Sequence, residues 1–255
     1  MSPADAYGET VESFRFELHG AGPAALALAR VPAAAEMHAA IGARWLSGAE
    51  HDRNSRFAVA HARADFLAGR IAAKTAARIL DPHSLPAAQW EIVPGENHQP
   101  RIGHVLRDHA VSLAHAGGLG LGAVFPASVR CGVDLEAADR DAGDVIATQV
   151  TPEEAAWARA GGDEQRTRWM LLWTAREAQG KSYGTGLLEP QRLVATRGWT
   201  PASHGWRARF AGNDAALVRA VVAGRWVVAL VLPAATETDP IARWLASTLS
   251  ASVFP

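Results

Sequence analysis

The stretch Cys131-Gly132-Val133-Asp134-Leu135-Glu136 is the most informative part of the chain. Its alternation predicts a short strand with Val133 and Leu135 on a buried face. Asp134 and Glu136 are two residues apart, so a strand places both carboxylates on its other face. Two such carboxylates repel each other, and Mg²⁺, which takes oxygen ligands, is a candidate cation between them. The alternative is that the pair forms an ordinary solvated strand face.

A second informative stretch is Trp169-Met170-Leu171-Leu172-Trp173-Thr174-Ala175-Arg176-Glu177-Ala178-Gln179-Gly180-Lys181. On a helix, Trp173, Glu177 and Lys181 fall at i, i+4 and i+8 and therefore share one stripe. Glu177 offers a third carboxylate, and Lys181 lies one turn further on, in a position to meet a phosphate. The alternative is an ordinary Glu–Lys pair that stabilises the helix.

Further candidates for phosphate contacts precede the strand. Arg70 and Lys74 are four residues apart on a predicted helix, and Arg56 lies upstream of them. Arginine suits bidentate phosphate contacts and lysine acts as a point charge, although a solvated basic face is the alternative. In Ser112-Leu113-Ala114-His115-Ala116-Gly117, His115 stands at a strand end, where the small residues that follow leave room for a ligand.

The remaining elements follow from hydrophobic periodicity and from turn residues. In the first half we expect a helix within residues 34–50, a helix over 64–80, and strands over 109–113 and 118–125. In the second half we expect a helix with Thr151 as its N-cap, a longer helix over 164–182 ended by Gly184-Thr185-Gly186, and a hairpin over 216–222 and 225–232. The repeated order indicates an internal duplication, with two unrelated modules as the alternative.

Composition narrows the classes of partner. The 255 residues include 25 Lys and Arg against 26 Asp and Glu, so no overall field favours nucleic acid or an anionic membrane. Cys131 is the single cysteine, which excludes an intramolecular disulfide and favours a reducing compartment. The apolar runs are short or interrupted by proline, and no basic segment precedes them at the N-terminus. We therefore expect a soluble cytoplasmic protein with no nucleic-acid or membrane partner.

These signals occur together in the order that marks one family. By this order the chain resembles the 4'-phosphopantetheinyl transferase superfamily, in its longer, pseudo-duplicated, surfactin-type form. The resemblance extends over about residues 46–187. The residues that carry it are Leu46-Ser47 with Glu50, Arg53 and Arg56-Phe57, then Phe66-Leu67-Ala68-Gly69-Arg70, then residues 112–117, Gly132-Val133-Asp134-Leu135-Glu136, and residues 173–181.

The resemblance implies an α+β fold with two similar α/β halves related by pseudo-twofold symmetry, residues 1–126 and 127–255, of which the second carries the metal site. It implies an enzyme of the holo-[acyl-carrier-protein] synthase type. Such an enzyme transfers 4'-phosphopantetheine from coenzyme A to a serine of an acyl or peptidyl carrier protein and releases 3',5'-ADP. Coenzyme A would lie between the halves, and a duplicated chain would act as a monomer.

The resemblance also assigns the site residues. The metal ligands, for Mg²⁺ or Mn²⁺, are Asp134, Glu136 and Glu177. Glu177 is in addition a candidate proton acceptor, and Lys181 is the residue that meets the pyrophosphate. The contacts to coenzyme A are Arg70 and His115 at the 3'-phosphate, with Arg56, Lys74 and Ser112 as further contacts.

Three departures from the family pattern stand out. Ala114 and Ala116 replace serines around His115, and His98-Gln99-Pro100 stands where the family has Gly-Lys-Pro. Arg176 stands where lysine is common, which keeps the charge. The two alanines leave open a member that binds coenzyme A or a carrier protein without turnover. A carboxylate triad with a lysine would also suit an unrelated metal-dependent phosphohydrolase.

Overall fold

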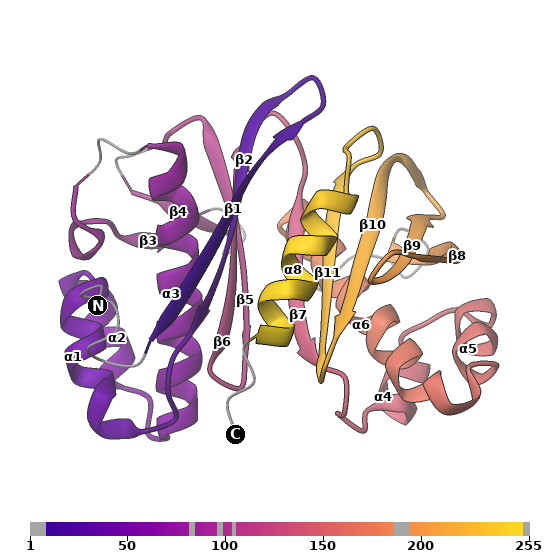
Figure 1. Ribbon diagram of the computed structural model, residues 1–255, viewed down its shortest axis with the longest axis horizontal. Coiled ribbons are helices and arrows are strands. Elements are labelled where there is room, and N and C mark those ends of the chain that lie inside the picture. The colour runs from indigo at the N-terminus through magenta and orange to yellow at the C-terminus, as the bar shows by residue number, and fades with distance from the viewer. Residues whose placement is uncertain (1–8, 82–84, 96–98, 104–105, 186–193, 252–255) are drawn as a thin grey trace. The chain divides into compact units, whose positions relative to one another are not determined.

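The structure is a computed structural model that describes residues 9–81, 85–95, 99–103, 106–185 and 194–251 (Figure 1). His98, Gly186 and Leu187 lie outside these ranges. The chain divides into two compact units, the first holding residues 1–17 and 21–129 and the second residues 130–255 with Leu18–Gly20. The described part has helices and three sheets, which fits the predicted α+β class.

The first unit has a long helix packed on a four-stranded sheet of order β1-β2-β6-β5. The helix is α3 (Ala60–Leu80), and the strands are β1 (Thr10–Leu18), β2 (Gly22–Arg30), β5 (His109–Ala116) and β6 (Leu119–Pro126). Gly120 and Gly122 of β6 allow close contact with this helix. A Cβ atom on Gly122 would lie 2.4 Å from the backbone nitrogen of Ala73, so a larger residue would push the helix off the sheet.

Shorter elements complete the first unit. They are α1 (Ala35–Trp45), α2 (Gly48–Ser55), the 3₁₀ helix η2 (Ala87–Gln89) and a small sheet of β3 (Ile92–Pro94) and β4 (Pro100–Ile102). Helix α2 begins with a capping box in which Ser47 and Glu50 bond each other's backbone N–H groups.

The second unit has a five-stranded sheet of order β7-β11-β10-β9-β8. Its strands are β7 (Gly132–Ala137), β8 (Thr196–Ala202), β9 (Gly205–Phe210), β10 (Asn213–Ala223) and β11 (Trp226–Pro233). Its helices are α4 (Gly143–Ala147), α5 (Pro152–Arg159), α6 (Gln165–Tyr183) and α8 (Asp239–Ala251), with the 3₁₀ helix η4 (Gly162–Glu164) before α6. Helix α6 shares a core with Val218 and Ala220 of β10. Arg219 between them faces the other side, where Asp239 begins α8.

Most of the elements expected from the sequence are confirmed. The expected helix over 164–182 is α6, which ends at Gly184 in the left-handed conformation, and the expected hairpin is β10 and β11. Thr151 caps α5 as predicted. The helix expected over 64–80 begins earlier, at Ala60.

Seven elements of the structure were not predicted from the sequence: β1, β2, α2, α4, β8, β9 and α8. Strand β2 is buried over Ala24–Ala29 on both faces, so it shows no alternation of polar and apolar residues. Helix α2 is short and mostly exposed, so it shows no apolar stripe.

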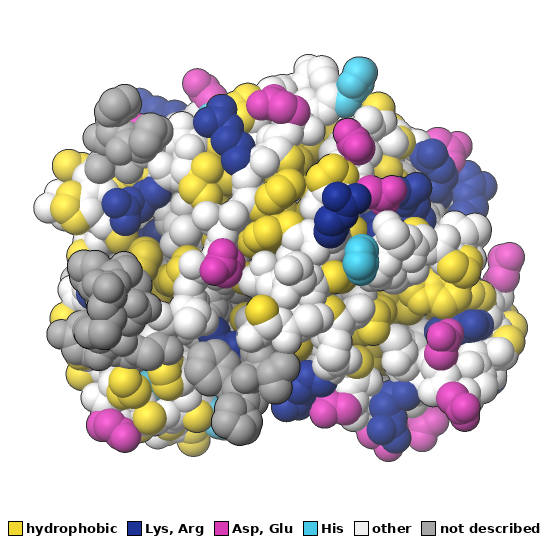
Figure 2. Space-filling model, in the orientation of Figure 1, with side chains coloured by type: hydrophobic (Ala, Val, Ile, Leu, Met, Phe, Trp, Pro, Cys, Tyr) yellow, Lys and Arg dark blue, Asp and Glu magenta, His cyan; other side chains and the backbone are white. Residues whose placement is uncertain are grey.

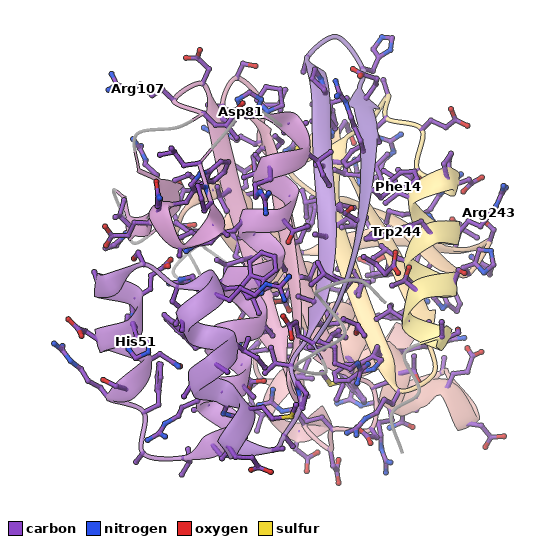
Figure 3. All side chains as sticks on the ribbon, turned by 60° about the vertical axis from the view of Figure 1, so that its left-hand side comes forward. Phe14, His51, Asp81, Arg107, Arg243 and Trp244 are labelled. Carbon is purple, nitrogen blue, oxygen red and sulfur yellow. The ribbon has the colours of Figure 1, made fainter. Side chains whose placement is uncertain are left out.

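Charged side chains of both signs lie on the surface of the described part. Figure 2 shows basic and acidic side chains interspersed on one face of the molecule. On α8, Arg243 is exposed and points outward (Figure 3). Among the described helices, none has the length and apolar character that a membrane span needs.

Candidate active site

Strand β7 lies directly against α6, and Gly132 makes this possible. A Cβ atom on Gly132 would lie 2.0 Å from the carbonyl oxygen of Ala178, a backbone atom of α6 that cannot easily move. The hydrogen-bonded neighbour of β7 is β11, in which Ala229 is opposite Asp134 and Val227 is opposite Glu136. The absence of a side chain at Gly132 therefore brings the two carboxylates of β7 close to the polar stripe of α6.

Asp134 and Lys181 are in direct contact. The ammonium nitrogen of Lys181 lies 2.6 Å from Oδ1 of Asp134. Oδ2 of the same carboxylate is buried and has no hydrogen-bond partner within the described residues. Burial raises the pKa of Asp134 to about 7, Lys181 opposes this rise, and the negative charges of Glu136 and Glu177 add to it.

Trp173, which is on α6 like Lys181, binds the carboxylate of Glu136 on β7. Its indole Nε1–H donates a hydrogen bond of 3.1 Å to Oε1 of Glu136, and the exposed guanidinium of Arg140 contacts the same carboxylate at 3.3 Å. The stripe predicted on α6 thus reaches both carboxylates of β7, through Trp173 and through Lys181. Helical spacing predicts Trp173 on this stripe, but it does not predict the hydrogen bond from Trp173 to Glu136.

Glu177 belongs to the same electrostatic group. Burial raises its pKa, Lys181 opposes the rise, and Glu136 adds to it. Because Asp134 responds to Glu136 and Glu177 as well, the three carboxylates predicted as metal ligands repel one another across the contact between β7 and α6.

The donor set fits a divalent cation by its chemistry. Three carboxylates, one with a buried oxygen that has no partner among the described residues, match the hard oxygen ligands that Mg²⁺ and Mn²⁺ take. Within the described residues, however, no three acidic, histidine or cysteine side chains are already grouped as a metal site. The convergence of Asp134, Glu136 and Glu177 on one cation stays a prediction.

The candidate phosphate contacts in the first unit have different environments. Lys74 is fully buried and its ammonium donates to Oε2 of Glu50 and to the carbonyl oxygen of Trp45, at 2.5 and 2.7 Å. Arg70 lies 3.4 Å from Glu50 and its guanidinium covers the ring of Phe66 at 4.5 Å. Burial lowers the pKa of both basic groups and Glu50 opposes this. The burial of Lys74 gives it a structural role and does not support a phosphate contact.

His115, Ser112 and Arg56 are placed differently from one another. His115 is exposed on β5 and lies beside α3, since a Cβ atom on Gly69 would be 3.2 Å from its ring. Ser112 is buried and is three residues away on the same strand, so the two side chains are on opposite faces. Arg56 is exposed at the C-terminal end of α2. Only His115 and Arg56 are therefore accessible among these three.

A buried glutamate with the same local role occurs in each unit. Oε1 of Glu50 accepts the backbone N–H of Ile92 at 3.0 Å, and Oε1 of Glu154 accepts that of Thr196 at 2.6 Å; each pair is 42 residues apart. Each glutamate also completes a capping box. Glu154 lies 3.7 Å from the buried Arg176 of α6, as Glu50 lies beside the basic residues of α3.

The burial of these two glutamates and their bonds to distant backbone N–H groups were not predicted from the sequence. The signals in the sequence are the motifs Ser47-x-x-Glu50 and Thr151-x-x-Glu154, which predict capping boxes. A capping glutamate is usually exposed, whereas here each carboxylate is buried and needs a cation from the long helix. The basic residues of α3 and Arg176 serve this need within their own units.

A comparison with protein families finds a match within the second unit. Residues 130–231, from β7 into β11, match the family model of the 4'-phosphopantetheinyl transferase superfamily. The match agrees with the resemblance found in the sequence, and the matched region contains Asp134, Glu136, Glu177 and Lys181. The match supports phosphopantetheinyl transferase activity in general. A search among curated proteins found no significant match to the chain.

Proposed function

We propose that the protein transfers 4'-phosphopantetheine from coenzyme A to a serine of an acyl or peptidyl carrier protein in the cytoplasm. The observation that carries this proposal is the group formed by Asp134, Glu136, Glu177 and Lys181 at the contact of β7 with α6, within the matched family region. Three carboxylates and one ammonium suit a reaction at a pyrophosphate, because the metal and the lysine would offset its negative charge.

In this proposal Asp134, Glu136 and Glu177 hold Mg²⁺ or Mn²⁺. A bound divalent cation supplies charge neutralisation at the pyrophosphate and at the leaving group. Trp173 orients Glu136 through its indole N–H, and Lys181 moves from Asp134 to the pyrophosphate. The side chain of Lys181 is 28% exposed, so its flexible stem has room for this movement.

The reaction forms one bond and breaks one. The serine oxygen of the carrier bonds to the β-phosphorus of coenzyme A, and the bond from this phosphorus to the oxygen of 3',5'-ADP breaks. Glu177 takes the proton of the serine. Its raised pKa brings it closer to neutral pH, where a general base works best.

Contacts to coenzyme A are proposed for His115 and Arg56, which are exposed, and for Arg70, whose side chain is 11% exposed. Ser112 and Lys74 are buried, so any contribution from them would act through the packing of their unit.

We also propose that the two units descend from one duplicated module with pseudo-twofold symmetry, and that a single copy of the chain is active. The support is the repeated capping-box glutamate, which bonds a backbone N–H 42 residues further on in each unit. In each unit, a strand also approaches the backbone of a long helix at glycine: at Gly120 and Gly122 in the first unit and at Gly132 in the second. The proposed halves are residues 1–126 and 127–255, of which the second holds the metal ligands.

The test is incubation of the purified protein with coenzyme A, Mg²⁺ and a panel of apo carrier proteins, followed by intact-mass measurement. We expect a carrier to gain the mass of one phosphopantetheine group with wild type and not with Glu177→Gln. Glu153→Gln, an exposed glutamate of α5, is the matched control and should leave transfer unchanged. No mass gain on any carrier, with coenzyme A still bound in calorimetry, would instead support a member without turnover. Release of 3',5'-ADP without a carrier would support a phosphohydrolase.

A further inference from the structure

Four arginines share one face of the sheet in the second unit. Arg207 and Arg209 are two residues apart on β9 and so project to the same side. Arg197 of β8 is directly opposite Arg209, and Arg219 of β10 is directly opposite Arg207. We call these four residues the arginine face. Like charges directly opposite on neighbouring strands destabilise a sheet, so this arrangement requires compensating anions.

The chain supplies only part of this compensation. Asp239 lies 2.5 Å from Arg207 and 3.7 Å from Arg219, and Asp214 lies 2.6 Å from Arg197. Arg209 donates instead to the backbone carbonyl oxygen of Asp214 at 2.9 Å. Within the described residues Arg209 has no carboxylate partner, although it stands opposite another arginine.

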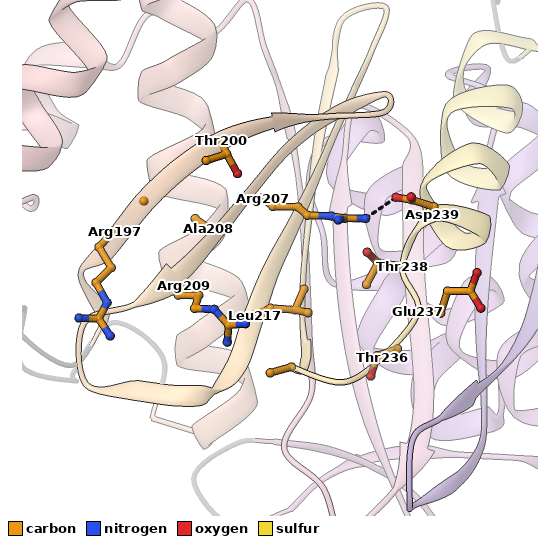
Figure 4. A pocket seen from close by; sticks show the side chains of 12 residues that line it. Arg197, Thr200, Arg207, Ala208, Arg209, Leu217, Thr236, Glu237, Thr238 and Asp239 are labelled. Atoms are coloured by element: carbon orange, nitrogen blue, oxygen red, sulfur yellow. Dashed lines mark hydrogen bonds and ion pairs between the residues drawn. The ribbon is translucent and has the colours of Figure 1, made fainter.

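A cavity of about 740 Å³ opens on the arginine face (Figure 4). Arg197, Arg207 and Arg209 line it on the side of the sheet. The segment that leads into α8 lines the other side with Thr236, Glu237, Thr238 and Asp239. Leu217 adds an apolar surface beside Arg209. The volume is within the range of about 300–1,000 Å³ that is usual for small-molecule sites.

We propose that this cavity binds a small molecule with a phosphate or carboxylate group, and that Arg209 is its principal contact. The guanidinium offers a planar set of donors that matches an oxyanion in two-point contact. The ion pair of Arg207 with Asp239 fixes the neighbouring arginine and ties β9 to the start of α8, so the wall of the cavity is preformed. The cavity shares no lining residue with the group around Asp134 and Lys181, so the proposal does not depend on the proposed transferase activity.

The test is a titration of the purified protein with sodium phosphate and, separately, with sodium malonate, each compared with sodium chloride at the same ionic strength. The readout is the NMR signal of the arginine Nε–H groups together with the melting temperature. We expect saturable binding of at least one of the two anions. The anion that binds shows whether the site takes a phosphate or a carboxylate group. Arg209→Gln should weaken it about tenfold, the loss expected for one charge-assisted hydrogen bond.

Arg243→Gln is the matched control, because Arg243 is an exposed arginine of the same unit that points away from the protein (Figure 3). Arg197→Gln is a second variant in case Arg209→Gln does not fold. Glu177→Gln distinguishes this site from the proposed active site, since it should leave anion binding at the arginine face unchanged. The proposal is overturned if neither anion shows saturable binding, or if the arginine variants and the Arg243→Gln control bind it equally.

Discussion

The ammonium of Lys181 lies 2.6 Å from Oδ1 of Asp134, in a position that a divalent cation would share. One carboxylate oxygen is thus bonded to a lysine, while the other is buried without a partner in the described residues. A divalent cation bound as proposed would therefore compete electrostatically with Lys181 for Asp134, although both would favour a reaction at a pyrophosphate.

This competition predicts opposite effects for Lys181→Met. In the absence of coenzyme A, the variant should bind Mn²⁺ about tenfold more tightly at pH 8.5, because a unit charge about 4 Å away contributes about 1–4 kcal/mol in partly exposed surroundings. Its transfer rate should fall, because the charge that meets the pyrophosphate is lost. Calorimetry with Mn²⁺ measures the first effect and carrier mass analysis the second. Lys181→Arg keeps the charge and is the control; equal or weaker Mn²⁺ binding by Lys181→Met would contradict the prediction.

The buried carboxylate of Asp134 also predicts a dependence of stability on pH. Burial raises its pKa from 3.8 to about 7, so the folded state binds the proton more tightly than the unfolded state. The metal-free protein should therefore lose stability as the pH rises between these two values. The free energy of unfolding should fall by no more than about 1.4 kcal/mol for each step of one in pH.

Asp134→Asn tests this relation in the presence of a chelator. The variant should melt at a higher temperature than wild type at pH 8, and the difference should shrink at pH 5, where wild-type Asp134 is protonated. Added Mg²⁺ should raise the melting temperature of wild type and not of Asp134→Asn. A variant that is less stable than wild type at pH 8 would show that the bond to Lys181 outweighs burial.

Gly132 predicts a coupling between packing and activity. In Gly132→Ala the new Cβ would collide with the backbone of α6, so β7 must shift away from Glu177 and Lys181. We expect a loss of about 1–3 kcal/mol in stability, as for other overpacked sites, together with a large loss of transfer. Gly48→Ala is the control, because nothing lies within 4 Å of its added Cβ atom and a helix favours alanine. Denaturant unfolding measures both variants, and wild-type stability in Gly132→Ala would refute the contact.

The buried glutamates predict structural roles for Arg176 and Lys74, the buried basic residues that they contact. Glu154→Gln leaves the buried guanidinium of Arg176 without its carboxylate, which should cost about 3–5 kcal/mol. Glu50→Gln should destabilise the first unit in the same way through Lys74. Glu153→Gln, exposed on α5, should change stability little. Thermal unfolding compares the three, and an unchanged Glu154→Gln would mean that water or a backbone group compensates Arg176.

The grouping of the candidate site residues on β7 and on α6 could be predicted from the sequence because it follows the periodicity of a strand and of a helix. A period of two places Asp134 and Glu136 on one face, and a helical period places Glu177 and Lys181 on one stripe. The contact of Trp173 with Glu136 and the role of Gly132 depend on how closely the strand approaches the helix. That distance is set by tertiary packing and has no local signature.

The candidate phosphate contacts in the first unit show that a sequence pattern does not distinguish exposed basic residues from buried ones. An arginine and a lysine four residues apart give the same sequence pattern whether they face solvent or a buried carboxylate. The buried ion pair of Lys74 with Glu50 therefore could not be predicted from this spacing. In contrast, Ser112 and His115 are an odd number of residues apart on one strand. Their opposite orientation could have been inferred from this spacing alone.

Trp173 predicts a defect that is confined to the site. In Trp173→Phe the ring still packs but the hydrogen bond to Oε1 of Glu136 is lost, so that among the described residues the exposed Arg140 is left to hold the carboxylate. One hydrogen bond to a charged group is worth about 1.5–3 kcal/mol, so metal affinity and transfer should both fall about tenfold or more. Stability in the presence of a chelator should change less, because Glu136 can reach solvent. Arg140→Gln is the comparison: its contact is exposed, so a loss of metal affinity as large as that of Trp173→Phe would show that the indole does not orient Glu136.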